Sequence, residues 1–410
     1  GQGAWPLYRQ WTPAEVQHYG RWIAHLYEVK TNGAAAERMA RIEDVLSNPR
    51  LNLLLDEGFR GTPSNPQLPV ETMRSMHAVL DCGKLTQALG AYYAYRRGLP
   101  WMVARIRSGD GEDIRRSAWN VVTGQNSSFE YDSLHAFFVD ATYGFCTGNY
   151  RIDPHRGNPE QSDTVPVALT RAALTPGVMW YLDGHVLILA GLDAYGEPRF
   201  MDSTVDKARD IYTHNGFNAV TGLTPAGTGD DALAGCYRGF RQYRFPIAET
   251  TAEGKVVDVR RRSDAEMAAF GFDLEQYHHM RRLQADGVIV EDGLPLDSFH
   301  ELMRLRLATA PRLDVQALIE READRLLARF QRREQAVQRG WRAVQEDGPI
   351  VFPARQGSTT VFNARGRWGE YSTAALDLGD RLAYYQLLDQ LDAALNWYDN
   401  RPDYIVLPDG

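Results

Sequence analysis

The pattern of apolar and polar residues divides the chain into helical ends and a strand-rich middle. Near the N-terminus, Thr12-Pro13-Ala14-Glu15 has the residue types of a capping box, and apolar side chains follow it at helical spacing. From about Gly254 the sequence carries charged amphipathic patterns, of which residues 314–345 and 384–398 are the clearest. We therefore expect helices on both sides of a unit that contains a sheet.

The clearest single element in the middle is a helix that begins at Cys82. Apolar residues repeat at helical spacing after it, and Gly98 and Pro100 supply a stop before residues 101–106, which have strand composition. A helix N-terminus stabilises a thiolate, because its unpaired N–H groups and its dipole favour negative charge. Cys82 is therefore a candidate nucleophile, although a small buried residue is the commoner role of an isolated cysteine.

Residues 178–202 have the pattern of three short strands joined by tight turns. Asp183-Gly184 is a hairpin dipeptide, and a second turn at 193–196 precedes the last strand. Antiparallel pairing can bring His185, at the start of one strand, beside Asp202, at the end of the next. With Cys82 they have the types and order of a thiol triad, in which a carboxylate orients the imidazole that moves protons for the thiolate.

Composition and charge narrow the classes of partner. The chain has 410 residues, 44% of them hydrophobic, which suffices for two or three domains or one large elaborated one. With 45 Lys and Arg against 53 Asp and Glu the net charge is -8, and no basic stripe is present, so we do not expect nucleic acid as a partner. No apolar run approaches the roughly 18 residues that a membrane span needs. We expect a peptide or protein substrate, and the oligomeric state stays open.

We divide the chain into an N-terminal helical segment (residues 1–75), a catalytic core (76–250) with an insertion at 107–170, and a mainly helical C-terminal region (251–410). Cys146 and Cys236 could pair in an oxidising compartment or remain unpaired buried thiols, and the sequence does not decide between these states. The first residues include no methionine, which is compatible with a processed or a trimmed start; the location stays open, with a secreted or periplasmic one slightly favoured over a cytoplasmic one.

We expect no cofactor and no metal. The three cysteines form no Cys-x-x-Cys pair, and His300-Glu301 lacks the second histidine of a zinc-protease helix. The acidic loop at residues 108–113 lacks the ligand alternation of an EF-hand. No phosphate loop or dinucleotide fingerprint is present.

At these residues the chain resembles the transglutaminase-like branch of the papain-like cysteine enzymes. In that family the cysteine opens a helix that ends in Gly-Ile-Pro and leads into a strand, which is similar to Cys82 followed by Gly98-Leu99-Pro100. The family histidine opens a strand, and its aspartate follows on the next one, usually as Asp-Pro-Thr, similar to His185 and to Asp202-Ser203-Thr204. The resemblance covers about residues 80–106 and 175–205.

The resemblance implies an α+β fold with a papain-like core and an antiparallel sheet, elaborated by large helical N- and C-terminal parts. It also implies Cys82 as nucleophile, His185 as general base and acid, and Asp202 as the orienting carboxylate. The backbone N–H of Cys82 is one natural oxyanion donor, and Gln67 or His77 is a candidate for the other.

The chain departs from the family pattern at several points. Leu187 stands where an aromatic residue is frequent, and Ser203 replaces the proline. The NlpC/P60 type of cell-wall peptidase is a related possibility, because its Asp-Cys-Ser-Gly and Gly-His-Val segments look like residues 81–83 and 184–186. That type usually has a further polar residue, often histidine, about a dozen residues later, and residues 192–197 contain no histidine, which favours the transglutaminase-like pattern.

The expected function is cysteine-dependent acyl transfer on an amide through a thioester, with hydrolysis of a peptide or amide favoured. Transamidation and glutamine deamidation use the same triad and differ only in the acyl donor and acceptor that the cleft admits. A catalytically inactive binding or scaffold protein with the same fold is the competing class. The insertion at 107–170 could be a lid that restricts access to one substrate.

Overall fold

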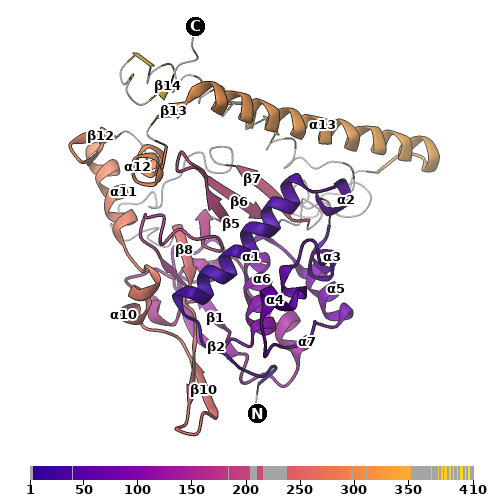
Figure 1. Ribbon diagram of the computed structural model, residues 1–410, viewed down its shortest axis with the longest axis vertical. Coiled ribbons are helices and arrows are strands. Elements are labelled where there is room, and N and C mark those ends of the chain that lie inside the picture. Colours follow the sequence, from indigo (N-terminus) through magenta and orange to yellow (C-terminus); the bar gives the residue numbers. More distant parts are fainter. Residues whose placement is uncertain are drawn as a thin grey trace.

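The computed structural model describes residues 3–351, except 39, 183, 204–209, 216–237, 297–298 and 311, together with part of residues 371–406. Helices and strands are mixed, and a six-stranded sheet in the order β3-β8-β4-β5-β6-β7 lies at the centre of the described residues (Figure 1). Every neighbouring pair in this sheet is antiparallel. The strands are β3 (Thr164–Pro166), β8 (Gly239–Tyr243), β4 (Met179–Leu182), β5 (His185–Leu192), β6 (Pro198–Asp202) and β7 (Tyr212–Asn215).

The N-terminal quarter is helical, as predicted. The Thr12 hydroxyl accepts a hydrogen bond from Glu15 N and caps the first helix, so the expected helix start is confirmed. The helices are α1 (Pro13–Asn32), α2 (Ala35–Arg38), α3 (Ile42–Ser47), η1 (Leu53–Leu55), α4 (Glu57–Arg60), α5 (Val70–Val79) and α6 (Cys82–Arg97).

One hydrophobic core joins this helical part to the sheet. Trp22 of α1 and Leu89 of α6 belong to the same buried cluster as Met179 of β4 and Ile188 of β5. Because apolar side chains on both sides of residue 75 share this cluster, the N-terminal helices pack as part of the central unit.

A second buried cluster covers the other face of the sheet. Trp180, Leu187 and Phe200 point to this side and pack with residues of α12 (Phe299–Leu307). Alternate residues of β4 and β5 thus enter different clusters, as the two-residue period of a strand requires. The sheet is therefore enclosed by apolar side chains on both faces.

Residues 107–170, expected as an insertion, are built into the packed unit. β1 (Met102–Ser108) and β2 (Asn120–Ser127) form an antiparallel pair with a bulge after Arg105, and β3 joins the central sheet. The other elements of this part are α7 (Leu134–Ala136), the π-helical turn η2 (Phe137–Ala141), α8 (Thr142–Gly144), η3 (Thr147–Tyr150) and η4 (Pro159–Gln161). All four residues of η3 are buried, so this part of the segment belongs to the packed interior.

The C-terminal part contains two short hairpins in addition to the helices expected from about Gly254. Residues 256–260 pair antiparallel with residues 247–250 in a first hairpin, and a second hairpin follows at 289–296. The strands are β9 (Ile247–Thr250), β10 (Val256–Arg260), β11 (Ile289–Glu291), β12 (Leu294–Leu296), β13 (Leu313–Asp314) and β14 (Ile405–Val406); the helices are α10 (Asp264–Met267), η6 (Ala268–Phe270), α11 (Glu275–Asp286), α12 and α13 (Val315–Asp347).

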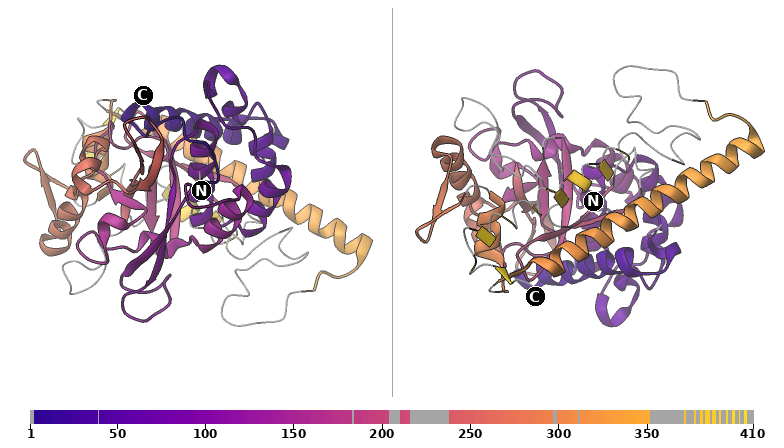
Figure 2. Two further views of the ribbon diagram at one scale, coloured as in Figure 1. Left: turned by 90° about the horizontal axis from the view of Figure 1, so that it is seen from below. Right: turned by 90° about the horizontal axis from the view of Figure 1, so that it is seen from above.

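The helix predicted for residues 314–345 is confirmed as α13, 33 residues long and capped by Asp314, which accepts from Ala317 N. It runs across one end of the molecule and projects beyond it (Figure 2). Within the described residues, no helix combines the length and apolar character needed to span a membrane.

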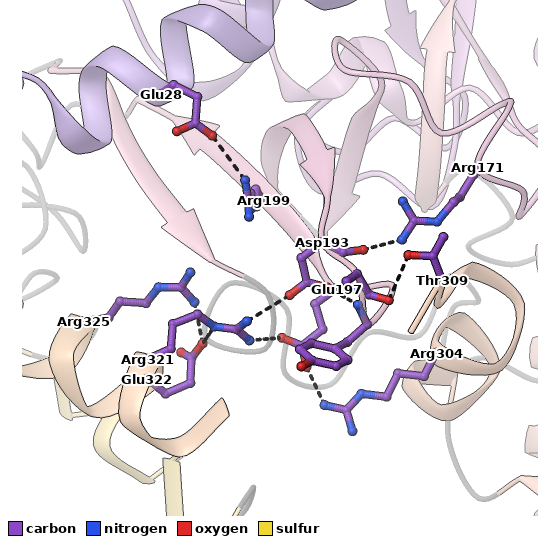
Figure 3. Close-up of polar contacts among 12 residues, drawn as sticks. Glu28, Arg171, Asp193, Glu197, Arg199, Arg304, Thr309, Arg321, Glu322 and Arg325 are labelled. Atoms are coloured by element: carbon purple, nitrogen blue, oxygen red, sulfur yellow. Dashed lines mark hydrogen bonds and ion pairs between the residues drawn. The ribbon is translucent and has the colours of Figure 1, made fainter. Parts of the chain in front are cut away.

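Charged residues attach the C-terminal helices to the turn between β5 and β6 (Figure 3). Glu197, only 2% exposed, accepts from Arg304 of α12 and from Arg321 of α13. Arg321 also lies 3.3 Å from an Asp193 carboxylate oxygen. The two long strands β5 and β6 are therefore held at this end by ion pairs.

Candidate active site

Cys82 is the first residue of α6. Asp81 caps this helix, because its Oδ1 accepts from Lys84 N at 2.8 Å while its Oδ2 pairs with Lys84 Nζ at 2.7 Å. At the other end Gly98 takes the left-handed conformation, with a φ of 66°, and ends the helix. The predicted start and stop of this helix are confirmed, and the first-turn N–H groups gather beside the Cys82 side chain.

The register of the sheet brings His185 and Asp202 together. Ile188 pairs with Met201, and continuing this register sets Asp202 opposite Leu187. His185 is two residues before Leu187, which makes it the diagonal neighbour of Asp202. The ring nitrogen Nε2 of His185 lies 2.8 Å from Asp202 Oδ2.

The three side chains differ in their access to solvent. The His185 side chain is 30% exposed, whereas that of Asp202 is 1% exposed. Cys82 is 8% exposed. A buried carboxylate behind a partly exposed imidazole is the arrangement that fixes the ring while leaving one edge able to exchange protons.

The charge of the neighbours changes the proton affinity of His185. Burial alone lowers the pKa of this imidazole, but the negative charge at Cys82, the hydrogen bond to Asp202 and a hydrogen bond to the Cys82 sulfur raise it to about 10. At neutral pH the ring therefore carries a proton, and it lies between the Cys82 sulfur and the Asp202 carboxylate.

Tyr150 borders the thiol from the side of η3. Burial raises the pKa of its hydroxyl well above the ordinary value, and the charge at Cys82 adds to this rise. The Tyr150 hydroxyl is also hydrogen-bonded to Thr86, which lies one helical turn after Cys82 on α6. Sequence reasoning did not single out Tyr150, because a buried tyrosine in an irregular segment has no distinguishing pattern.

Gln67 is not brought to Cys82, which corrects its assignment as an oxyanion donor. Its Nε2 donates to Leu46 O at 2.7 Å, and its Oε1 accepts from Tyr92 and Arg96. Tyr92 is ten residues along α6 from Cys82, which is about 15 Å at the helical rise. The amide therefore ties the far half of α6 to the helices before it.

His77, the other candidate donor, lies in the last turn of α5 with its Nδ1 3.6 Å from Glu43 Oε2. Its role as an oxyanion donor stays a prediction.

Of the other cysteines, Cys146 is a free thiol that precedes η3 and accepts a hydrogen bond from Gly148 N at 3.3 Å. Burial raises the pKa of this thiol. Cys236 lies outside the described residues. The described part of the chain contains no group of three or more His, Cys, Asp or Glu residues that could hold a metal ion.

Comparison of the chain with models of protein families, with curated proteins and with solved structures finds no match. Its function has therefore to be inferred from its own residues.

Proposed function

We propose that the chain is a cysteine-dependent acyl-transfer enzyme with a papain-like, transglutaminase-like core, which hydrolyses amide bonds in a peptide or protein. The observation that carries this proposal is the position of His185, between a thiol at a helix N-terminus and a buried carboxylate, with its pKa raised to about 10. A thiolate and imidazolium pair of this kind is the resting state of an activated cysteine nucleophile.

In the first half of the reaction, the Cys82 thiolate forms a C–S bond to the carbonyl carbon, and the backbone N–H of Cys82 is the proposed donor to the developing oxyanion. The imidazolium of His185 then gives its proton to the amide nitrogen, the C–N bond breaks, and the amine departs. A thioester on Cys82 and a neutral His185 remain.

The second half follows from the loss of charge at Cys82. The thioester sulfur is neutral, so the charge that raises the pKa of His185 is absent and the ring can accept a proton from water. The water oxygen attacks the thioester, the C–S bond breaks, and the thiolate and imidazolium are restored. Asp202 keeps the ring in place through both halves.

Hydrolysis is favoured over transamidation because water needs no dedicated binding site. The acceptor is tested by incubating the native chain with a peptide library that contains glutamine, in the presence and absence of a primary amine. Cleavage of a peptide into two fragments with a new amino end and a new carboxyl end indicates peptide hydrolysis, ammonia release with glutamate formation indicates deamidation, and incorporation of the amine indicates transamidation.

Cys82→Ser and His185→Ala are the matched controls, and Cys146→Ser controls for loss of a thiol elsewhere. We expect a product, and an acyl adduct on the Cys82 peptide, in the native chain and in Cys146→Ser only. An adduct or product that persists in Cys82→Ser would contradict the proposal. The proposal would also be contradicted if the native chain gave neither adduct nor product and the reactivity of Cys82 did not depend on His185.

A further inference from the structure

The segment from Cys146 to Arg151 connects the helix of the nucleophile to the turn that carries the histidine. η3 within it lies against the first turn of α6 on one side and against β4 on the other. From Thr147 onward its residues are buried, Tyr150 fully and Arg151 at 4% exposed. This segment can therefore determine the distance between the Cys82 thiol and the His185 ring.

On the helix side the contact is close because residue 83 is glycine. A Cβ at Gly83 would lie 3.1 Å from Cys146 C and 3.2 Å from Thr147 N. One turn later, the Thr86 hydroxyl donates to Gly83 O at 2.7 Å, which leaves its oxygen to accept from Tyr150. The Tyr150 hydroxyl also lies 3.1 Å from Met179 Sδ of β4.

On the histidine side the contact is made by Tyr181. Its hydroxyl accepts from Gly184 N at 3.3 Å and from Arg151 Nη1 at 3.3 Å. Gly184 has a φ of 81° and directly precedes His185, so this hydrogen bond spans the tight turn between β4 and β5. The rings of Tyr150 and Tyr181 stack with centroids 5.3 Å apart and planes 7° from parallel.

We propose that Tyr150 and Tyr181 are positioning residues. Their stacked rings, with the hydrogen bonds to Thr86 and to Gly184, join the N-terminus of α6 to the turn before His185. The position of His185 relative to Cys82 is thereby fixed. Arg151 completes the link by donating to Tyr181 and, through Nε, to Ser117 O at 2.7 Å. This inference rests on the proposed function, because it assigns these residues to the reactivity of the Cys82 and His185 pair.

The test uses the full chain and the variants Tyr181→Phe and Tyr150→Phe, which keep the rings and remove the hydroxyls. The readouts are the rate of Cys82 alkylation by iodoacetamide at pH 6 relative to pH 9, and the NMR titration of His185. Because each variant removes one hydrogen-bonding group, we expect the pH 6 to pH 9 ratio to fall about two- to tenfold and the His185 titration to move to lower pH.

Tyr93→Phe is the matched control. Like Tyr150 and Tyr181, Tyr93 is fully buried, but it lies on α6, far along the helix from Cys82, and its hydroxyl donates to Glu15 and contacts His18. This variant should lower the unfolding temperature as the others do without changing the alkylation ratio. If Tyr150→Phe fails to fold, Thr86→Val removes the same hydrogen bond from the helix side.

The outcomes separate this inference from the proposed function. Alkylation ratios in Tyr181→Phe, Tyr150→Phe and Thr86→Val that equal the ratio in Tyr93→Phe would overturn the inference while leaving the function in place, provided that His185→Ala still lowers the native rate. A native rate that is independent of His185 would overturn both.

Discussion

The two ends of the β5–β6 hairpin both carry charged residues, and they differ in what the charges contact. At the turn, Glu197 is buried and contacts two guanidinium groups, while Asp193 accepts from two backbone N–H groups and pairs with Arg321 (Figure 3). At the other end, Asp202 faces His185, and the ring of His185 faces a thiol.

The difference suggests separate roles for the two ends of the hairpin, with the charges at the turn acting in folding and those beside Cys82 acting in the proposed reaction. The charges at the turn join β5 and β6 to α12 and α13, and each carboxylate has a guanidinium partner. At the other end, the raised pKa of His185 depends on its neighbours Cys82 and Asp202, and in the proposed reaction Cys82 is the group that a substrate modifies. We therefore expect changes at the turn to affect folding and changes at the triad to affect chemistry.

The largest effect is expected from Asp202→Asn. The amide has nearly the shape of the carboxylate but no charge, so the imidazolium and with it the Cys82 thiolate lose stability. We expect the rate of Cys82 alkylation at pH 6 to fall about 100-fold, equivalent to about 2.7 kcal/mol, with the unfolding temperature nearly unchanged. An unchanged rate in the folded variant would remove Asp202 from the triad.

Glu197→Gln should show the opposite behaviour. It leaves Arg304 and Arg321 without their shared buried carboxylate, and we expect the free energy of unfolding, measured with urea, to fall by about 2 kcal/mol. Glu28→Gln is the matched control, since Glu28 pairs with Arg199 in a pair whose side chains are 51% and 41% exposed. That variant should change stability by less than about 0.5 kcal/mol.

Neither Glu197→Gln nor Glu28→Gln should alter the pH dependence of Cys82 alkylation. A changed pH profile in Glu197→Gln would show that the turn and the triad are coupled, and the contrast between the two ends would fail.

Cys82→Ala tests the charge that acts on His185. The native ring should keep its proton up to about pH 10 and lose it as the pH rises further. Because the variant removes both the thiolate charge and the hydrogen bond to sulfur, the pKa of His185 should fall by at least about one pH unit, measured by imidazole NMR. Cys146→Ala should leave the His185 titration as in the native chain. An unchanged His185 titration in Cys82→Ala would contradict the effect of Cys82 on the pKa of His185.

The smallest effect is expected from Gly83→Ala. Alanine favours a helix by up to about 1 kcal/mol, but its Cβ would press against Cys146 and Thr147, so stability should change by less than about 1 kcal/mol. We expect Cys82 alkylation at pH 6 to slow by a few fold because η3 has to move. In Gly144→Ala, where a Cβ meets no atom within 4 Å, the rate should not change, and equal rates in both variants would contradict this role of η3.

Elements marked by local signals could be predicted from the sequence. Thr12 and Asp314 are caps that act within one helical turn, and the antiparallel pairing of β4 with β5 was expected from the hairpin dipeptide in the sequence between them. The contact of His185 with Asp202 was expected because the two residues lie on consecutive strands, and the antiparallel pairing of β5 with β6 brings them together. The mixed helix and sheet composition followed from the same periodic signals.

Features that depend on tertiary contacts were missed. β2 is polar, Asn120-Val-Val-Thr-Gly-Gln-Asn-Ser, and β3 has only three residues, so neither has a readable alternation. Gln67 was misassigned because its position before the cysteine in sequence does not reveal that its amide binds Tyr92 and Arg96. The contact between Tyr181 and Gly184 likewise has no sequence signature.

The most direct measurement is the pH dependence of iodoacetamide alkylation at Cys82, located by peptide mass spectrometry, in the native chain and in His185→Ala. Cys146 reacts in the same tube and serves as a reference thiol, since burial raises its pKa. An ordinary thiol, with a pKa near 8.5, is less than about 1% ionised at pH 6.

We predict that Cys82 labels rapidly at pH 6, that Cys146 labels only in alkaline solution, and that His185→Ala slows Cys82 at pH 6 at least about 100-fold. Labelling of Cys82 that rises with that of Cys146 in alkaline solution, or that is the same without His185, would contradict the proposed triad.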